Sequence, residues 1–97
     1  MSVFFEWSHD KAEGNARKHG VSFEEAVTCF ADPLSSTIPD PLHSEGEHRF
    51  VLLGMSKRQR LLVVAYTEVE AETGATIRVI SARPANRAEV KQHEQGP

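Results

Sequence analysis

The second half of the chain holds three closely spaced β-rich segments, and these constrain the fold more than any other feature. They cover residues 49–55, 60–68 and 76–82. Four polar residues join the first two, and a turn that contains Gly74 joins the last two. Connections this short predict antiparallel neighbours, because parallel strands need a crossover of a dozen or more residues. The apolar run LLVVAY indicates that the middle strand is central.

The start of the chain predicts a strand followed by a helix. Residues 3–7 are short and β-rich, which is typical of a strand. A helix is predicted over residues 10–19, with Ser8 or Asp10 as its N-cap. Gly20 is placed to end this helix in the left-handed conformation.

A second helix is predicted to begin at Ser22, which forms a capping-box pattern with Glu25. Apolar residues follow at helical spacing, and the sequence Asp-Pro at 32–33 ends the helix. The next stretch, as far as residue 48, is predicted to be mostly loop with a short edge strand near 35–38.

The complete set of elements predicts an α+β domain. Pro84 is expected to open a final helix over residues 85–93 as a first-turn proline. The order is then β-α-α-(β)-β-β-β-α, in a single domain that covers residues 1–97. We expect an antiparallel sheet of three to five strands, with two N-terminal helices and one C-terminal helix.

The composition excludes several classes of protein. No apolar run approaches the roughly 18 residues of a membrane span, and the first ten residues lack the basic and apolar regions of a secretory signal. The single cysteine, Cys29, cannot form an internal disulfide, which favours a reducing cytoplasm. The sequence has no Walker loop, no G-x-G-x-x-G and no C-x-x-C pattern. We therefore expect a cytoplasmic protein with no cofactor.

The net charge of −3 conceals an uneven distribution along the chain. Residues 1–48 carry nine acidic and three basic side chains, whereas residues 49–97 carry five acidic and eight basic ones. An excess of cations in one half is typical of a basic functional face, such as one that binds a polyanion. Chance variation in the surface charge of a small protein is the alternative.

Six of the eight cations of the second half form the first candidate site. They are Arg49, Lys57, Arg58, Arg60, Arg78 and Arg83. Strict alternation along the last strand would place Arg78 on the same face as Ala82 and opposite Val79. Several guanidinium groups on one face would bind a nucleic-acid backbone, because each presents a rigid fork of donors to phosphate oxygens. The alternative is that these cations only decorate the solvent face of an antiparallel sheet.

Two further groups carry side chains suited to chemistry. Lys18 and His19 end the first predicted helix, where a histidine suits general acid–base work but also serves as a C-terminal cation. Between His43 and His48, two imidazoles and two carboxylates are typical of metal ligands, and a polar loop is the alternative. The thiol and two hydroxyls that we considered lack a nucleophile motif: Cys29, Ser56 and Ser81.

Several motifs occur in a characteristic order. The strongest are KHGVSFEEA at 18–26 and IRVISAR at 77–83. The others are FEW at 5–7, KA at 11–12 with Asn15, FADP at 30–33, HS at 43–44 with Glu47 and Arg49, GMS at 54–56, YTE at 66–68, and Ala85. With this set, which spans about residues 4–90, the chain resembles the BrnT toxins of bacterial type II toxin–antitoxin systems, a branch of the RelE/ParE-like superfamily.

The resemblance implies a RelE-like ribonuclease that inhibits translation and is neutralised by a BrnA-like antitoxin. It implies metal-independent attack of the ribose 2′-OH on the adjacent phosphate. Operator DNA would be bound only through the antitoxin complex, with a homodimer of the toxin inside a heterotetramer as one arrangement. In this reading Arg78 and Arg83 stabilise the phosphate and His19 transfers a proton. The supporting RNA-binding cations are Lys18, Arg49, Lys57 and Arg60.

One position departs from the family pattern. The family commonly has an arginine directly after the Tyr-Thr-Glu segment, where this chain has Val69. Loss of one transition-state contact can cost about 10²–10³-fold in rate. The alternative function is therefore a catalytically weak or inactive binding module that acts as antitoxin partner and co-repressor.

Overall fold

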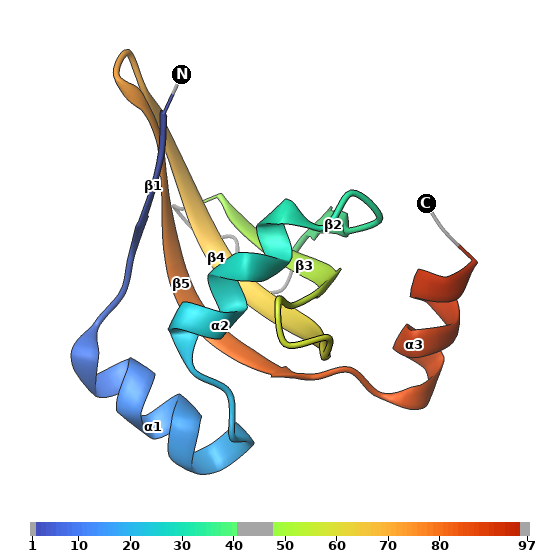
Figure 1. Ribbon diagram of the computed structural model, residues 1–97. Helices are drawn as coiled ribbons and strands as arrows, with labels where there is room; N and C mark the ends of the chain where they lie inside the picture. The colour runs from blue at the N-terminus through green and yellow to red at the C-terminus, as the bar shows by residue number, and fades with distance from the viewer. Residues whose placement is uncertain (1, 41–47, 96–97) are drawn as a thin grey trace.

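The computed structural model describes residues 2–40 and 48–95, which form one five-stranded sheet and three α-helices (Figure 1). The strand order across the sheet is β1-β5-β4-β3-β2. The elements are β1 (Ser2–Glu6), α1 (His9–His19), α2 (Phe23–Thr28), a short 3-10 helix η1 (Cys29–Ala31), β2 (Ser36–Pro39), β3 (Arg49–Met55), β4 (Leu61–Ala71), β5 (Gly74–Pro84) and α3 (Arg87–Glu94).

The antiparallel pairing of β3, β4 and β5 is confirmed, with β4 at the centre. The expectation of a wholly antiparallel sheet is wrong at one edge, because β1 pairs with β5 in parallel. Most of the chain separates these two strands and provides the long crossover that a parallel pair requires. The turn predicted at residues 69–75 is also shorter, since the strands extend to Ala71 and Gly74.

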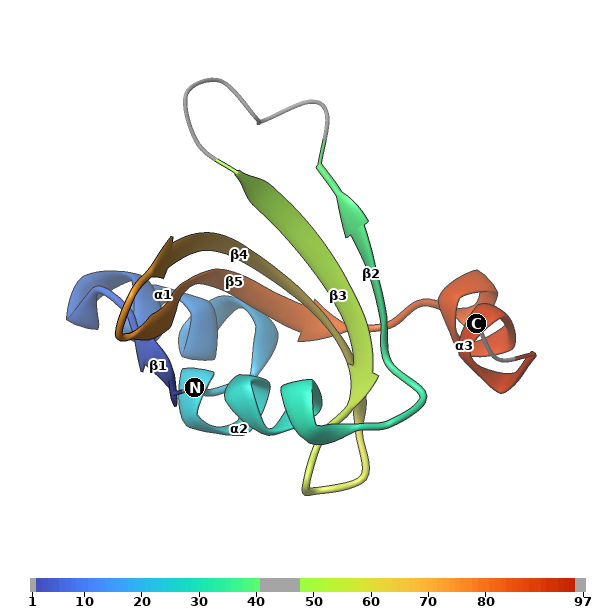
Figure 2. The same cartoon turned by 90° about the horizontal axis from the view of Figure 1, so that it is seen from above.

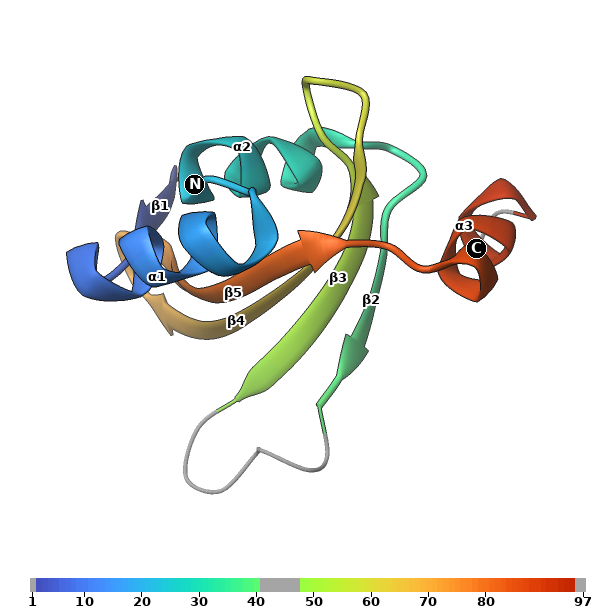
Figure 3. The same cartoon turned by 90° about the horizontal axis from the view of Figure 1, so that it is seen from below.

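The two N-terminal helices cover one face of the sheet, and the core lies between them and β3–β5 (Figures 2 and 3). Val21 and Phe23 pack there against Leu62, Val64 and Val79, all fully buried or nearly so. None of the helices among the described residues is long and apolar enough to span a bilayer. Burial of these side chains is the main favourable contribution to folding.

A buried amide fixes α1 to the sheet. The side chain of Asn15 donates to the carbonyl oxygens of Val21 and Ala82, each at 2.9 Å, and accepts from the Ala82 N–H at 3.0 Å. Three hydrogen bonds satisfy this polar group inside the core, so its burial carries no unpaired donor or acceptor. The contact holds the C-terminal half of α1 over β5.

Two helix starts differ from the sequence patterns. Ser22 caps α2 by accepting from the Glu25 N–H, but the Glu25 carboxylate bonds to other residues, so the reciprocal half of the predicted capping box does not form. Pro84 does not open the last helix, because it still belongs to β5. Asn86 is the N-cap of α3, with Glu89 completing a capping box.

A β-bulge in β5 corrects the predicted alternation of its side chains. Ala65 pairs with Ser81, but the next residue of β4, Tyr66, pairs with Val79, so Ile80 is an extra residue. Ala82 therefore joins Val79 on the face covered by α1 and α2. Beyond the bulge, Arg83 projects from the opposite face, which we call the open face.

Candidate functional site

The open face carries a row of polar side chains across four strands. In the register of the sheet, Arg49 pairs with Thr67, Thr67 with Arg78, and Arg78 with Glu6. Paired residues of neighbouring strands share a face, and strands lie about 4.8 Å apart. Arg49 and Arg78 thus flank Thr67 at a separation of about 10 Å. We call these four residues the arginine row.

Both arginines of the row have carboxylate partners from the first half of the chain. Arg78 Nη1 donates to Glu6 Oε2 at 2.7 Å, and both side chains are half exposed. Arg49 Nε lies 3.7 Å from Asp40 Oδ2, too far for a hydrogen bond, and this buried nitrogen has no hydrogen-bond partner among the described residues. The row therefore offers an exposed ion pair that an anion can engage, beside a buried guanidinium nitrogen that the described residues leave without a hydrogen bond.

Arg83 lies further along the same face and binds Glu89 of α3. Its Nη1 and Nη2 donate to the two carboxylate oxygens, each at 2.9 Å. The hydrogen bond between the two side chains lowers the pKa of Glu89 and raises that of Arg83. Because Glu89 also accepts from the N–H of Asn86, this arginine is held at the first turn of α3. RNA that binds Arg83 must therefore compete with Glu89.

A small hollow of about 70 Å³ lies between α3 and the sheet. It is lined by Ser36, Ile38, Val51, Leu53, Val63, Glu89 and Gln92. Near the C-terminal end of α3, the His93 ring bonds to Asp32 at 2.9 Å, and both side chains are largely buried. Helix α3 thus lies at the Arg83 end of the open face rather than over the arginine row.

Four of the predicted RNA-binding and catalytic residues lie elsewhere. Lys18 and His19 end α1, which lies over the covered face. Arg60 donates to the Gly20 carbonyl and to both oxygens of the Glu25 carboxylate, and Lys57 belongs to the same turn between β3 and β4. The structure therefore brings Arg49, Arg78 and Arg83 to one face and does not place His19 with them.

Arg60 takes part in the most extensive buried ionic network of the described chain. The Glu25 side chain, 3 % exposed, accepts from Ser56 Oγ at 2.7 Å and from Arg60 Nε at 2.9 Å. The hydrogen bond from Arg60 is the largest cause that lowers the pKa of Glu25, and it outweighs the opposing effect of burial. This network ties α2 to the turn at residues 56–60, which gives Arg60 a structural role.

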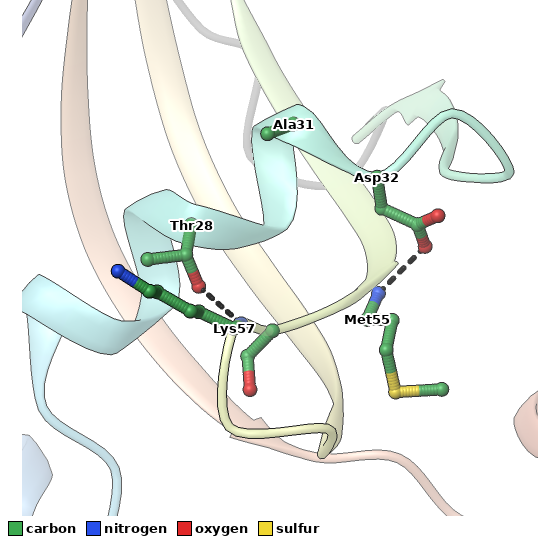
Figure 4. Close-up of a pocket in the computed structure, with 6 residues that line it drawn as sticks. Thr28, Ala31, Asp32, Met55 and Lys57 are labelled. Carbon is green, nitrogen blue, oxygen red and sulfur yellow. Dashed lines mark hydrogen bonds between the residues drawn. The ribbon is translucent and has the colours of Figure 1, made fainter.

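A second hollow lies beside α2 and η1 and measures about 480 Å³ (Figure 4). It is lined by Thr28, Ala31, Asp32, Met55, Ser56 and Lys57. Its polar groups already bond to one another: Thr28 Oγ1 accepts from the Lys57 N–H, and Asp32 accepts from the Met55 N–H. This hollow is open and mainly apolar. Its carboxylate, Asp32, bonds to the Met55 N–H and to His93, and no contact with the Lys57 side chain is seen among the described residues.

Other candidates from the sequence contribute no site within the part of the chain that the structure describes. The segment from His43 to Glu47 lies outside the described residues, and no group of three metal-ligating side chains occurs within them. Burial raises the pKa of the Cys29 thiol to about 12, so that this cysteine is an inert part of the core.

Sequence reasoning missed Glu6 and Thr67 in the row and Glu89 beside Arg83. Only the strand register places Glu6 beside Arg78, since 72 positions separate them in the chain. The Asn86–Glu89 spacing is a capping-box pattern, and this signal would have identified the start of α3.

Comparisons with known proteins point in one direction. Residues 7–89 match a family model described as the ribonuclease toxin BrnT of a type II toxin–antitoxin system. The fold is similar to the crystal structure of the Brucella abortus ribonuclease toxin BrnT, with a TM-score of 0.65 and 20% sequence identity. That match covers 90% of this chain and 100% of the other. No curated protein matches the sequence.

Proposed function

This chain belongs to the BrnT family of ribonuclease toxins of type II toxin–antitoxin systems, and we propose that it cleaves RNA on the open face of its sheet. The observation that supports this location is the presence of Arg49, Arg78 and Arg83 on one face. The bulge at Ile80 places Arg78 and Arg83 on the same face. In a regular strand these two residues, five positions apart, would project from opposite faces.

The position at which the chain departs from the family pattern also supports an RNA site on the open face. Val69 lies two residues beyond Thr67 on β4, so its side chain projects from the open face, and it is 64% exposed. An arginine at this position in other family members would extend the arginine row. The family feature and the arginines of this chain thus point to one surface.

The proposed chemistry is metal-independent attack of a ribose 2′-OH on the adjacent phosphate. Arg49 and Arg78 hold the phosphate from two sides, while Arg83 binds it or its neighbour after displacement from Glu89. Preformed cations of this kind stabilise the charge that develops on the pentacoordinate phosphorus. Lys18, Lys57 and Arg60 lie away from this face, and His19 is retained as a proton-transfer candidate only if the RNA also reaches the end of α1.

The proposed partner is a BrnA-like antitoxin, since a type II toxin acts together with a protein antitoxin. In this proposal the antitoxin supplies the contact with operator DNA, and two toxin chains form part of a heterotetramer. The free toxin acts on RNA in the bacterial cytoplasm and thereby stops translation.

Induction of the chain alone in bacteria tests this function. We expect growth arrest and loss of cellular RNA, and cleavage by the purified protein that persists in a metal chelator. Arg83→Ala should relieve the growth arrest without unfolding the protein. Arg87→Ala, on the exposed side of α3, should leave the growth arrest in place. Normal growth with abundant folded protein would contradict the ribonuclease proposal and favour a binding module.

A further inference from the structure

We propose that Glu6 is the residue that accepts the proton of the ribose 2′-OH. This inference rests on the proposed RNA cleavage and names the proton acceptor that the cleavage needs. It is motivated by the structure rather than by the sequence pattern, in which only His19 suggested proton transfer. Glu6 ends β1 and lies in register with Arg78, directly in the arginine row.

The geometry of Glu6 leaves one carboxylate oxygen available for a substrate. Oε2 accepts from Arg78 Nη1 at 2.7 Å, and Oε1 has no hydrogen-bond partner among the described residues. The side chain is half exposed, and β1 is an edge strand, so RNA can approach from the solvent side. A carboxylate held by one oxygen can therefore receive a proton with the other.

The other proton acceptors suit this role less well. Glu89 uses both oxygens for Arg83 and one of them also for the Asn86 N–H. His19 ends α1 on the covered face, so the sheet separates it from Arg78. Because a general base must reach the proton that it removes, position favours Glu6 over both residues.

The arrangement places a base and a phosphate-binding cation side by side. Arg78 would hold a nonbridging phosphate oxygen while Glu6 takes the proton from the neighbouring 2′-OH. The 2′-oxygen forms a bond to phosphorus, and the bond from phosphorus to the 5′-oxygen breaks. The leaving 5′-oxygen takes a proton from water, which yields a 2′,3′-cyclic phosphate and a 5′-hydroxyl end. Glu6 then returns its proton to solvent.

Glu6→Gln tests this assignment, because the amide oxygen still accepts from Arg78 but cannot take up a proton. We expect the cleavage rate constant to fall by about 10²–10⁴-fold. The Kd for a 2′-deoxy analogue of the RNA should stay within about twofold, and the thermal midpoint should not change. Glu70→Gln is the matched control, since it removes an exposed carboxylate from the same sheet, and it should cleave at the wild-type rate.

The pH dependence separates a base from a residue that only positions Arg78. The charged groups that face Glu6 in the described chain are Arg78 on β5 and, further along the row, Arg49. If Glu6 is the base, the pH–rate profile of the wild-type protein should have an acidic limb that the residual activity of Glu6→Gln lacks. Glu6→Asp should recover part of the rate.

The outcomes distinguish this inference from the proposed function. The substrates are a mixed-sequence single-stranded RNA and, in parallel, messenger RNA on translating ribosomes. If Glu6→Gln cleaves RNA at the wild-type rate, or if only His19→Ala loses cleavage, the assignment of Glu6 is overturned and the proposed function stands. Absence of wild-type cleavage on both substrates overturns the proposed function and this inference with it.

Discussion

At the scale of single residues, the candidate RNA-binding arginines are already paired within the protein. Arg78 binds Glu6 and Arg83 binds Glu89, while Arg49 lies near Asp40 without a hydrogen bond from Nε. A phosphate must therefore compete with protein carboxylates for these guanidinium groups. Exposed ion pairs of this kind contribute only about 0–1 kcal/mol, so this competition costs little at Arg78.

Val69→Arg is predicted to strengthen RNA binding and cleavage. The new guanidinium would project from the open face beside Thr67 and contact one more phosphate. Each phosphate contact on a single strand makes the negative slope of log K for binding against log salt concentration steeper by about 0.7. Binding of a 2′-deoxy oligonucleotide, measured over a range of salt concentrations, should show this steeper slope. Val69→Gln is the uncharged control, and equal slopes for the two variants would contradict the location of the site.

Glu25→Gln is predicted to destabilise the fold by about 2–3 kcal/mol, because it leaves the partly buried Arg60 without its carboxylate partner. The pKa of Glu25 is lowered in the folded state, so its stabilising effect is present above the unfolded pKa and is lost as the pH falls through the folded pKa. Urea unfolding between pH 3 and pH 7 measures this loss.

The variant and its control should differ clearly in that experiment. In Glu25→Gln the free energy of unfolding should depend less on pH below 4.5, the ordinary pKa of this side chain. Glu24→Gln, on the exposed side of the same helix, should change stability by less than about 0.5 kcal/mol. Equal effects of the two substitutions would show that the buried network contributes no stability.

At the scale of elements, close packing of β3 against η1 depends on one glycine. A Cβ atom at Gly54 would lie 2.9 Å from the Cys29 carbonyl oxygen and 3.2 Å from Ser35 Cβ. Gly54→Ala is therefore predicted to cost about 1–3 kcal/mol. Gly14 is in the middle of α1 with open space around it, so Gly14→Ala should stabilise by up to about 1 kcal/mol. Thermal midpoints that move in the same direction for both variants would contradict this account.

The bulge in β5 could not be predicted from the sequence. The β-rich pattern correctly predicts the strand, and strict alternation correctly separates Arg78 from Val79. No residue in the segment marks Ile80 as an insertion, however, because bulges arise from pairing with a neighbouring strand. The single extra residue brings Arg83 to the face of Arg78, where our proposal places the RNA.

Other parts of the fold were predictable for local reasons. The helix caps at Ser8 and Ser22 and the end at Gly20 follow from short-range hydrogen bonds and backbone conformation, and all three are confirmed. The parallel pairing of β1 with β5 was not predictable, because nothing local links residues so distant in the chain. The same limitation concealed the contact between Glu6 and Arg78.

At the scale of the whole molecule, part of the charge asymmetry is taken up by pairing between the two halves of the chain. Among the described residues, carboxylates of the first half pair with arginines of the second at Glu6–Arg78, Glu25–Arg60 and Asp40–Arg49, and Asp32 bonds to the His93 ring. The excess of cations in the second half is therefore partly neutralised within the fold. What distinguishes the open face is the position of its arginines, not their number.

The central claim is that RNA binds along the arginine row, and NMR titration with a non-cleavable 2′-deoxy oligonucleotide tests it most directly. The account predicts that the largest amide shifts occur at Arg49, Thr67, Arg78 and Glu6, with Arg83 affected as Glu89 is displaced. Shifts concentrated instead at the end of α1 and in the turn at residues 56–60 would contradict it.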